Sequence, residues 1–172
     1  MNRLLATAVT ALLLTGCAGP QSFTAFEPAT PADYTGPTVN VADQAIAVDP
    51  QRLHIFEITQ VDGRRLASSS TATQRAGQGR GMTVTPVALT NELAVRPARV
   101  QLQATTQYAS PVVALSRPTC RTVGEVGFTP QAGARYVVKG RIAAAAGAVW
   151  IADGARGPAV TAMGRGRARP RQ

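Results

Sequence analysis

Few residues in this chain of 172 could carry acid–base, nucleophilic or metal chemistry. There are two cysteines, Cys17 and Cys120, and one histidine, His54. One histidine cannot make a two-histidine metal site, and the cysteine spacing matches no zinc motif. A nucleophilic Cys120–His54 pair would need a third group to orient it. We therefore expect no metal, no cofactor and no catalytic residue, with His54 packed in a strand. Cys120 is expected to be half-buried, or joined to a second molecule in an oxidising compartment.

The carboxylates are scattered along the chain, and two of them suggest an alternative. Glu57 and Glu125 fall in segments with strand character, where two carboxylates can form an acid–base pair. Glu57 or Glu125, together with His54, would make a hydrolase or a carbohydrate-processing enzyme of the cell envelope. A concave pocket that gathers the three side chains would support this alternative, and their separation would remove it.

Cys17 stands at a change in composition near the start of the chain. Arg3 precedes an uncharged apolar run from Leu4 to Leu14, and Pro20 opens a polar, proline-rich segment. A helix over these 11 residues would be about 16 Å long, well short of the roughly 30 Å hydrocarbon core of a bilayer. A short apolar run behind a positive residue is typical of a secretory signal peptide.

Residues Leu14, Thr15, Gly16 and Cys17 resemble the bacterial lipobox, the pattern Leu-[Ala/Ser/Thr]-[Gly/Ala]-Cys of lipoproteins. The resemblance implies that the lipoprotein signal peptidase recognises Leu14, Thr15 and Gly16 and cleaves before Cys17. It also implies a diacylglycerol on the Cys17 sulfur, so that palmitate would label the protein. Two or three acyl chains hold a protein firmly in a membrane. Ala18, where an aspartate would signal the inner membrane, favours the periplasmic face of the outer membrane.

Behind residues 1–16, the expected signal peptide, composition divides the chain into three parts. Residues 17–38 hold four prolines without hydrophobic periodicity and are expected to form a flexible tether. Residues 39–163 are expected to form one domain. Residues 164–172 are expected to be a disordered tail, and the chain has a net charge of +9. Anionic lipid or lipopolysaccharide would attract the arginines of this tail, which are Arg165, Arg167, Arg169 and Arg171.

Short segments with strand character, separated by turn residues, predict an all-β domain. Asp62-Gly63 predicts a tight hairpin. Ser68–Gly81 contains no apolar residue larger than alanine and is predicted as a mobile loop, as is Ala109–Cys120. Ala42–Val48 fits either a helical turn or a strand. The predicted strands are Arg52–Val61, Met82–Leu89, Arg99–Gln107, Thr122–Phe128, Arg135–Ala143, Ala148–Ala152 and Pro158–Met163.

About seven such strands predict a single antiparallel β-sandwich. Three stretches resemble small Ig-like or transthyretin-like β-sandwich lipoproteins of bacterial envelopes: Asp62-Gly63, Gly133-Ala134-Arg135-Tyr136 and Trp150-Ile151-Ala152-Asp153. The resemblance implies the same sandwich and brings no catalytic residue with it.

The scarcity of titratable residues favours a non-enzymatic protein over a hydrolase. The expected function is that of a structural or interaction module, attached to the envelope membrane through its lipid. An accessory subunit of an outer-membrane machine, with an envelope protein as its partner, is a further alternative. Export to the envelope argues against a nucleic-acid partner.

Overall fold

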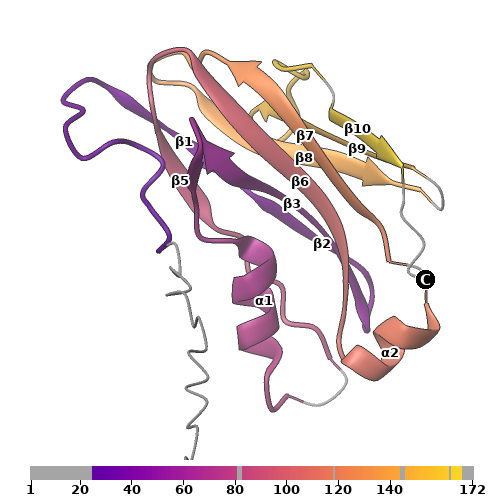
Figure 1. The fold of residues 1–172 in the computed structure, drawn as a ribbon. Helices are drawn as coiled ribbons and strands as arrows, with labels where there is room; N and C mark the ends of the chain where they lie inside the picture. Colours follow the sequence, from indigo (N-terminus) through magenta and orange to yellow (C-terminus); the bar gives the residue numbers. More distant parts are fainter. Residues whose placement is uncertain (1–24, 81–82, 118, 144–145, 163, 168–172) are drawn as a thin grey trace, which may run out of the picture.

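Two β-sheets pack face to face in the computed structural model, which describes residues 25–80, 83–117, 119–143, 146–162 and 164–167 (Figure 1). The predicted all-β sandwich is therefore confirmed. Its elements are β1 (Thr38–Ala42), β2 (Gln44–Asp49), β3 (Arg52–Val61), β4 (Arg64–Arg65), α1 (Ser69–Gly77), β5 (Thr90–Ala94), β6 (Ala98–Tyr108), α2 (Pro111–Ser116), β7 (Arg121–Phe128), β8 (Arg135–Ile142), β9 (Ala146–Asp153) and β10 (Gly164–Arg167).

The two sheets differ in how their strands follow one another. Sheet I has the order β10–β9–β8–β1–β5, and sheet II has the order β2–β3–β6–β7 with β4 beside β3. All neighbours are antiparallel except β1 and β8, which run parallel with Asn40 opposite Arg135. The predicted antiparallel sandwich thus contains one parallel pair. Between β1 and β8 the chain forms all of sheet II and also β5 of sheet I, which provides the long connection that parallel strands need.

The hydrophobic core fills the space between the sheets. On β6, Val100, Leu102 and Ala104 point inward and are fully buried, as the alternation of Arg99–Gln107 predicted. They pack with Phe56 of β3 and with apolar residues of β8 and β9. The other face of sheet II looks away from the core, and α1 lies beside that face (Figure 1).

The predicted hairpin at Asp62-Gly63 is also confirmed. It joins β3 to β4, and both turn residues have positive φ, 49° for Asp62 and 82° for Gly63. This conformation suits the right-handed twist of the flanking strands and explains why Asp and Gly stand here. The Asp62 carboxylate also accepts a hydrogen bond from the Arg99 amide at 2.9 Å, which ties the turn to β6.

The start of the expected tail is ordered, contrary to the prediction that residues 164–172 are disordered. Gly164–Arg167 forms β10 and pairs with β9. A Cβ on Gly124 of β7 would lie 2.6 Å from the Gly164 Cα, so the two backbones touch because neither residue has a side chain. Arg169 and Arg171 lie outside the described residues, as do the side chains of Arg165 and Arg167.

Three further predictions about local structure were wrong or only partly right. The segment 83–89 forms no strand, and Pro158–Met163 contributes only a bridge between Ala159 and Ala152 within its described part. Ala109–Cys120, predicted as a loop, contains α2, which begins with the favourable pair of an N-capping Ser110 and Pro111. The ambiguous segment Ala42–Val48 is a strand, since it lies mostly in β2.

Part of the expected tether is docked on the sandwich. The Glu27 amide donates to the Arg65 carbonyl at 2.8 Å, and Thr30 Oγ1 donates to the Glu92 carbonyl at 2.6 Å. Ala29 is buried. The boundary at residue 38 is therefore too late, because hydrogen bonds fix the chain from Glu27 onward. Residues 1–24, including the lipobox, lie outside the described part. Within that part, no helix has the length and apolar character needed to cross a membrane.

Candidate functional site

Helix α1 occupies the segment that was predicted to be a mobile loop, and polar bonds explain its order. Ser68 caps the helix by accepting a hydrogen bond from the Thr71 amide at 3.2 Å. Ser69 and Thr73 lie one turn apart and are both buried. Thr73 Oγ1 donates to the Val87 carbonyl at 3.1 Å and accepts from the Val87 amide at 3.0 Å. A helix held by hydroxyl groups lacks the apolar stripe from which helices are predicted.

Glu57 of β3 anchors the first turn of α1 to sheet II. Its carboxylate is fully buried and accepts four hydrogen bonds. Oε2 accepts from Ser68 Oγ and the Ser70 amide, both at 3.0 Å, and Oε1 accepts from Ser70 Oγ and Gln103 Nε2, both at 2.8 Å. A carboxylate offers about four acceptor sites, so these donors use its full capacity. Glu57 is therefore a structural group.

A second buried carboxylate, Asp43, lies under the same helix turn. It accepts from Ser69 Oγ at 2.6 Å and from the Ile58 amide at 3.0 Å. Burial raises the pKa of Asp43 to about 7, and the nearby Glu57 contributes in the same direction, against the effect of the two hydrogen bonds. The first turn of α1 therefore rests on two buried carboxylates.

The residues of the hydrolase alternative are not brought together. Alternation along β3 places His54 on the inner face with Phe56, whereas Glu57 lies on the outer face under α1. Glu125 is exposed on β7, two strands from β3, and forms an ion pair with Arg99 at 3.4 Å. Burial, and to a smaller extent the charge of Arg52, lowers the pKa of His54 below its ordinary value.

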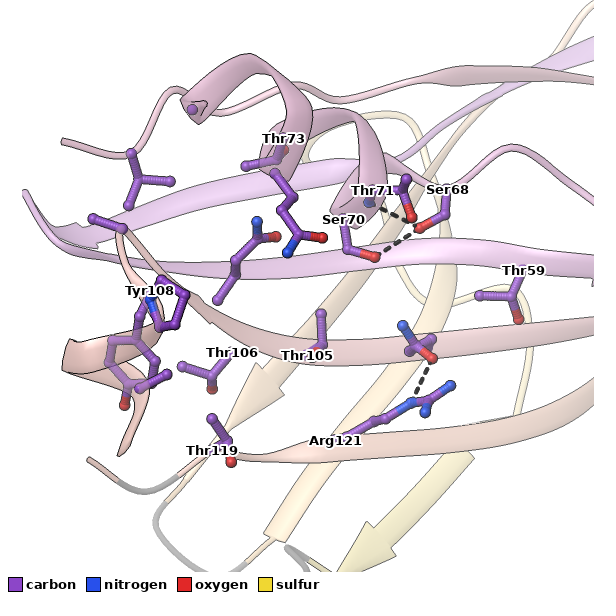
Figure 2. A pocket seen from close by; sticks show the side chains of 18 of the residues that line it. Thr59, Ser68, Ser70, Thr71, Thr73, Thr105, Thr106, Tyr108, Thr119 and Arg121 are labelled. Carbon is purple, nitrogen blue, oxygen red and sulfur yellow. Dashed lines mark hydrogen bonds between the residues drawn. The ribbon is translucent and has the colours of Figure 1, made fainter. Parts of the chain in front are cut away.

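A cavity of about 1110 Å³ lies over the outer face of sheet II, between α1 and the start of α2. Figure 2 shows its hydroxyl-bearing side chains gathered from β3, α1, β6 and the approach to β7. Sixteen of the 27 residues that line it are Ser, Thr or Gln. Such side chains both donate and accept hydrogen bonds, so the lining suits a polar ligand. Strands provide much of this surface, so many of these groups have fixed positions.

The charge of the cavity is positive. Among its described lining residues, Arg65 and Arg121 carry a formal charge and no carboxylate does, since Glu57 is covered. Arg65 lies over the ring of Phe26, with 5.9 Å from its guanidinium carbon to the ring centre. Arg121 donates from Nε to Gln103 Oε1 at 2.8 Å (Figure 2). Anionic groups are therefore favoured in this cavity over cationic ones.

Cys120 is buried rather than half-buried, because it is only 5% exposed. A disulfide to a second molecule would require Cys120, whose carbonyl accepts a hydrogen bond from the Thr106 amide at 2.9 Å, to move to the surface, so the fold does not favour that alternative. Within the described part of the chain, no cluster of three or more His, Cys, Asp or Glu residues could hold a metal ion.

Sequence reasoning missed the cavity because its residues belong to no motif. The visible signal was the polar half of the β6 alternation, which includes Gln101 and Gln103, but any solvated strand face has such a pattern. Much of the remaining lining comes from α1, which was predicted as a loop, and from separate short segments such as those of Thr59, Thr119 and Arg121. No protein-family model, no curated protein and no solved structure matches this chain.

Proposed function

We propose that this protein is a lipid-anchored protein of the cell envelope whose sandwich binds a polar ligand without catalysing a reaction. The observation that carries the proposal is the cavity on sheet II, with its hydroxyl and amide lining. The positions of the candidate acids and bases support a non-enzymatic role: Glu57 is buried and saturated with donors, and His54 lies on the other face of β3.

The anchor rests on the lipobox residues Leu14 to Cys17 and the apolar run before them. In this proposal, cleavage makes Cys17 the lipidated first residue, at the periplasmic face of the outer membrane. The docked segment from Glu27 onward then leaves ten residues, 17–26, between the lipid and the sandwich. Fully extended, they span about 35 Å, so the cavity stays close to the membrane.

The anchor is tested by metabolic labelling with palmitate. The unchanged protein should take up label, and Cys17→Ser should take up none and accumulate as uncleaved precursor. Continued labelling of the Cys17→Ser variant would refute the anchor.

The binding role is tested with the lipidated protein purified from its own solubilised envelope. Thr105→Trp places an indole in the cavity, and Thr129→Trp, in an exposed turn, is the matched control. A small molecule or glycan that co-purifies with the unchanged protein and with Thr129→Trp should be lost from Thr105→Trp. Identical co-purifying material from all three proteins, measured by mass spectrometry, would refute binding in the cavity.

A further inference from the structure

A line of hydrogen bonds crosses sheet II from α1 to β7 and ends at Arg121. Ser70 binds Glu57, Gln103 Nε2 donates to Glu57 Oε1 at 2.8 Å, and Arg121 Nε donates to Gln103 Oε1 at 2.8 Å. The Gln103 amide can be oriented in only one way, because a carboxylate only accepts and an arginine only donates. The position of the Arg121 guanidinium is thus set by Gln103 on the neighbouring strand and, through Gln103, by the buried Glu57 two strands away.

This arrangement prepares Arg121 to bind an anion. Its Nε is used by Gln103, while its two Nη groups bond no residue that the structure describes. The side chain is exposed and lines the cavity. Two Nη groups can hold two oxygens of a carboxylate or phosphate side by side. Because Gln103 already fixes the planar group, little conformational entropy remains to be lost on binding.

The remaining lining indicates what carries the anion. Hydroxyl and amide groups surround the site, with Thr105 directly opposite Arg121 in the strand register. The outer face of sheet II is three strand spacings, or about 14 Å, wide from β4 with Arg65 to β7 with Arg121. The two arginines are also offset along the strands, because Arg65 is level with Gln101 and Arg121 with Thr105. A ligand that follows this surface is therefore elongated, polar along its length and negatively charged in part.

A peptide fits this surface less well than a sugar chain. Peptides are commonly bound by adding a strand to a free sheet edge, but β3 and β6 form the floor of the cavity and are paired on both sides. Recognition here depends on side chains that both donate and accept, which match the hydroxyl groups of a sugar.

We infer that the cavity binds an acidic oligosaccharide, with Arg121 holding a carboxylate or phosphate of the sugar. This inference rests on the proposed function, because it names the ligand class of the same cavity. In it, Gln103 is a positioning residue and Arg121 is the residue that contacts the charged group.

The test is calorimetric titration of the purified full chain in non-ionic detergent. The probes are trigalacturonate, which carries carboxylates, and maltotriose phosphate, which carries a phosphate. Their neutral counterparts are trigalacturonate methyl ester and maltotriose. At least one acidic sugar should bind at least tenfold more tightly than its counterpart, and the tighter of the two identifies the anionic group.

Substitutions test whether the acidic sugar binds at Arg121. Arg121→Gln should weaken the acidic sugar at least tenfold and bring it to the level of the neutral one. Arg121→Lys, which keeps the charge without the paired Nη groups, should recover only part of the affinity. Arg156→Gln is the matched control, since Arg156 is exposed in the turn after β9, outside the cavity. It should leave the affinity unchanged.

Three results would overturn the inference. The first is that neither acidic sugar binds more tightly than its neutral counterpart. The second is that Arg121→Gln and Arg156→Gln change the affinity for the acidic sugar equally. The third is that the acidic peptide Asp-Gly-Asp-Gly binds more tightly than both acidic sugars. If the sugars fail while Thr105→Trp still loses its co-purified material, the ligand class is wrong and the binding role stands. If the sugars fail and the same material also co-purifies with Thr105→Trp, both this inference and the proposed function are wrong.

Discussion

The two faces of sheet II are made by the same strands, but one face packs in the core and the other faces α1 and the cavity. On β6, Leu102 and Ala104 face a dry core, while Gln103 and Thr105 face the helix and the cavity. Residues next to each other in sequence therefore belong to different surfaces. The inner face depends on shape and apolar area, and the outer face depends on hydrogen bonds whose partners come from distant segments. Substitutions that alternate along one strand should separate stability from binding.

The largest expected effect is on the inner face. Leu102→Ala removes a fully buried side chain and leaves a cavity, which should lower the free energy of unfolding by about 3–5 kcal/mol. Thr105→Ala on the outer face should change it by about 0.5 kcal/mol or less. Urea denaturation followed by circular dichroism measures both. Equal losses for the two variants would show that the faces are not energetically distinct.

The inner face is also the part of the fold that the sequence predicts well. Alternation over Arg99–Gln107 and the Asp62-Gly63 turn are local signals, and both reflect constraints that act within a few residues. Strand order is not local. Nothing in the sequence near Thr38–Ala42 indicates that this segment pairs with β5 and β8, because that pairing depends on how the sheets pack.

The next largest expected effect on the free energy of unfolding comes from Asp43 on the outer face, and it depends on pH. The pKa of Asp43 rises from 3.8 to about 7 on folding, so between these values the folded state binds more protons than the unfolded state. The contribution of Asp43 to stability is therefore fully present below about pH 3.8 and is lost as pH rises through about 7. The full difference corresponds to up to about 4 kcal/mol.

Asp43→Asn isolates this contribution. The variant mimics the protonated carboxyl, so its stability does not depend on this titration. The free energy of unfolding of the variant, relative to that of the unchanged protein, should therefore be higher at pH 8 than at pH 4.5. Urea denaturation at both pH values gives the comparison. Parallel pH dependences for the two proteins would contradict the assignment of a raised pKa to this buried group.

The smallest expected effect on the free energy of unfolding comes from His54 on the inner face. Its pH dependence is opposite in sign to that of Asp43. His54 is half-buried there and its pKa is lowered from 6.5. Its contribution to stability is present above about pH 6.5 and is lost as pH falls through the folded pKa. NMR titration of the His54 ring should give a midpoint below 6.5, and His54→Gln should remove a small destabilisation on the acid side. A midpoint at or above 6.5 would contradict burial at this position.

The candidate site could not be predicted from the sequence, for a physical reason. Glu57 was recognised as a carboxylate in a strand, but its role depends on Ser68 and Ser70, which were predicted to lie in a loop. Arg121 gains its role from Gln103, 18 residues earlier, through a side-chain bond between the neighbouring strands β6 and β7. Single hydrogen bonds between distant residues leave no periodic pattern, whereas burial of an apolar face does.

The parallel pairing of β1 with β8 also constrains the order in which the chain can fold. Asn40 and Arg135 face each other in this pair although they are 95 positions apart (135 − 40). Such distant contacts are made late and slow folding, because a long loop must close before any stabilising contact is gained. The β2–β3 and β6–β7 pairs join strands that follow more closely in sequence. We therefore expect sheet II, beneath the cavity, to form first, and β1 to be among the last strands to pair.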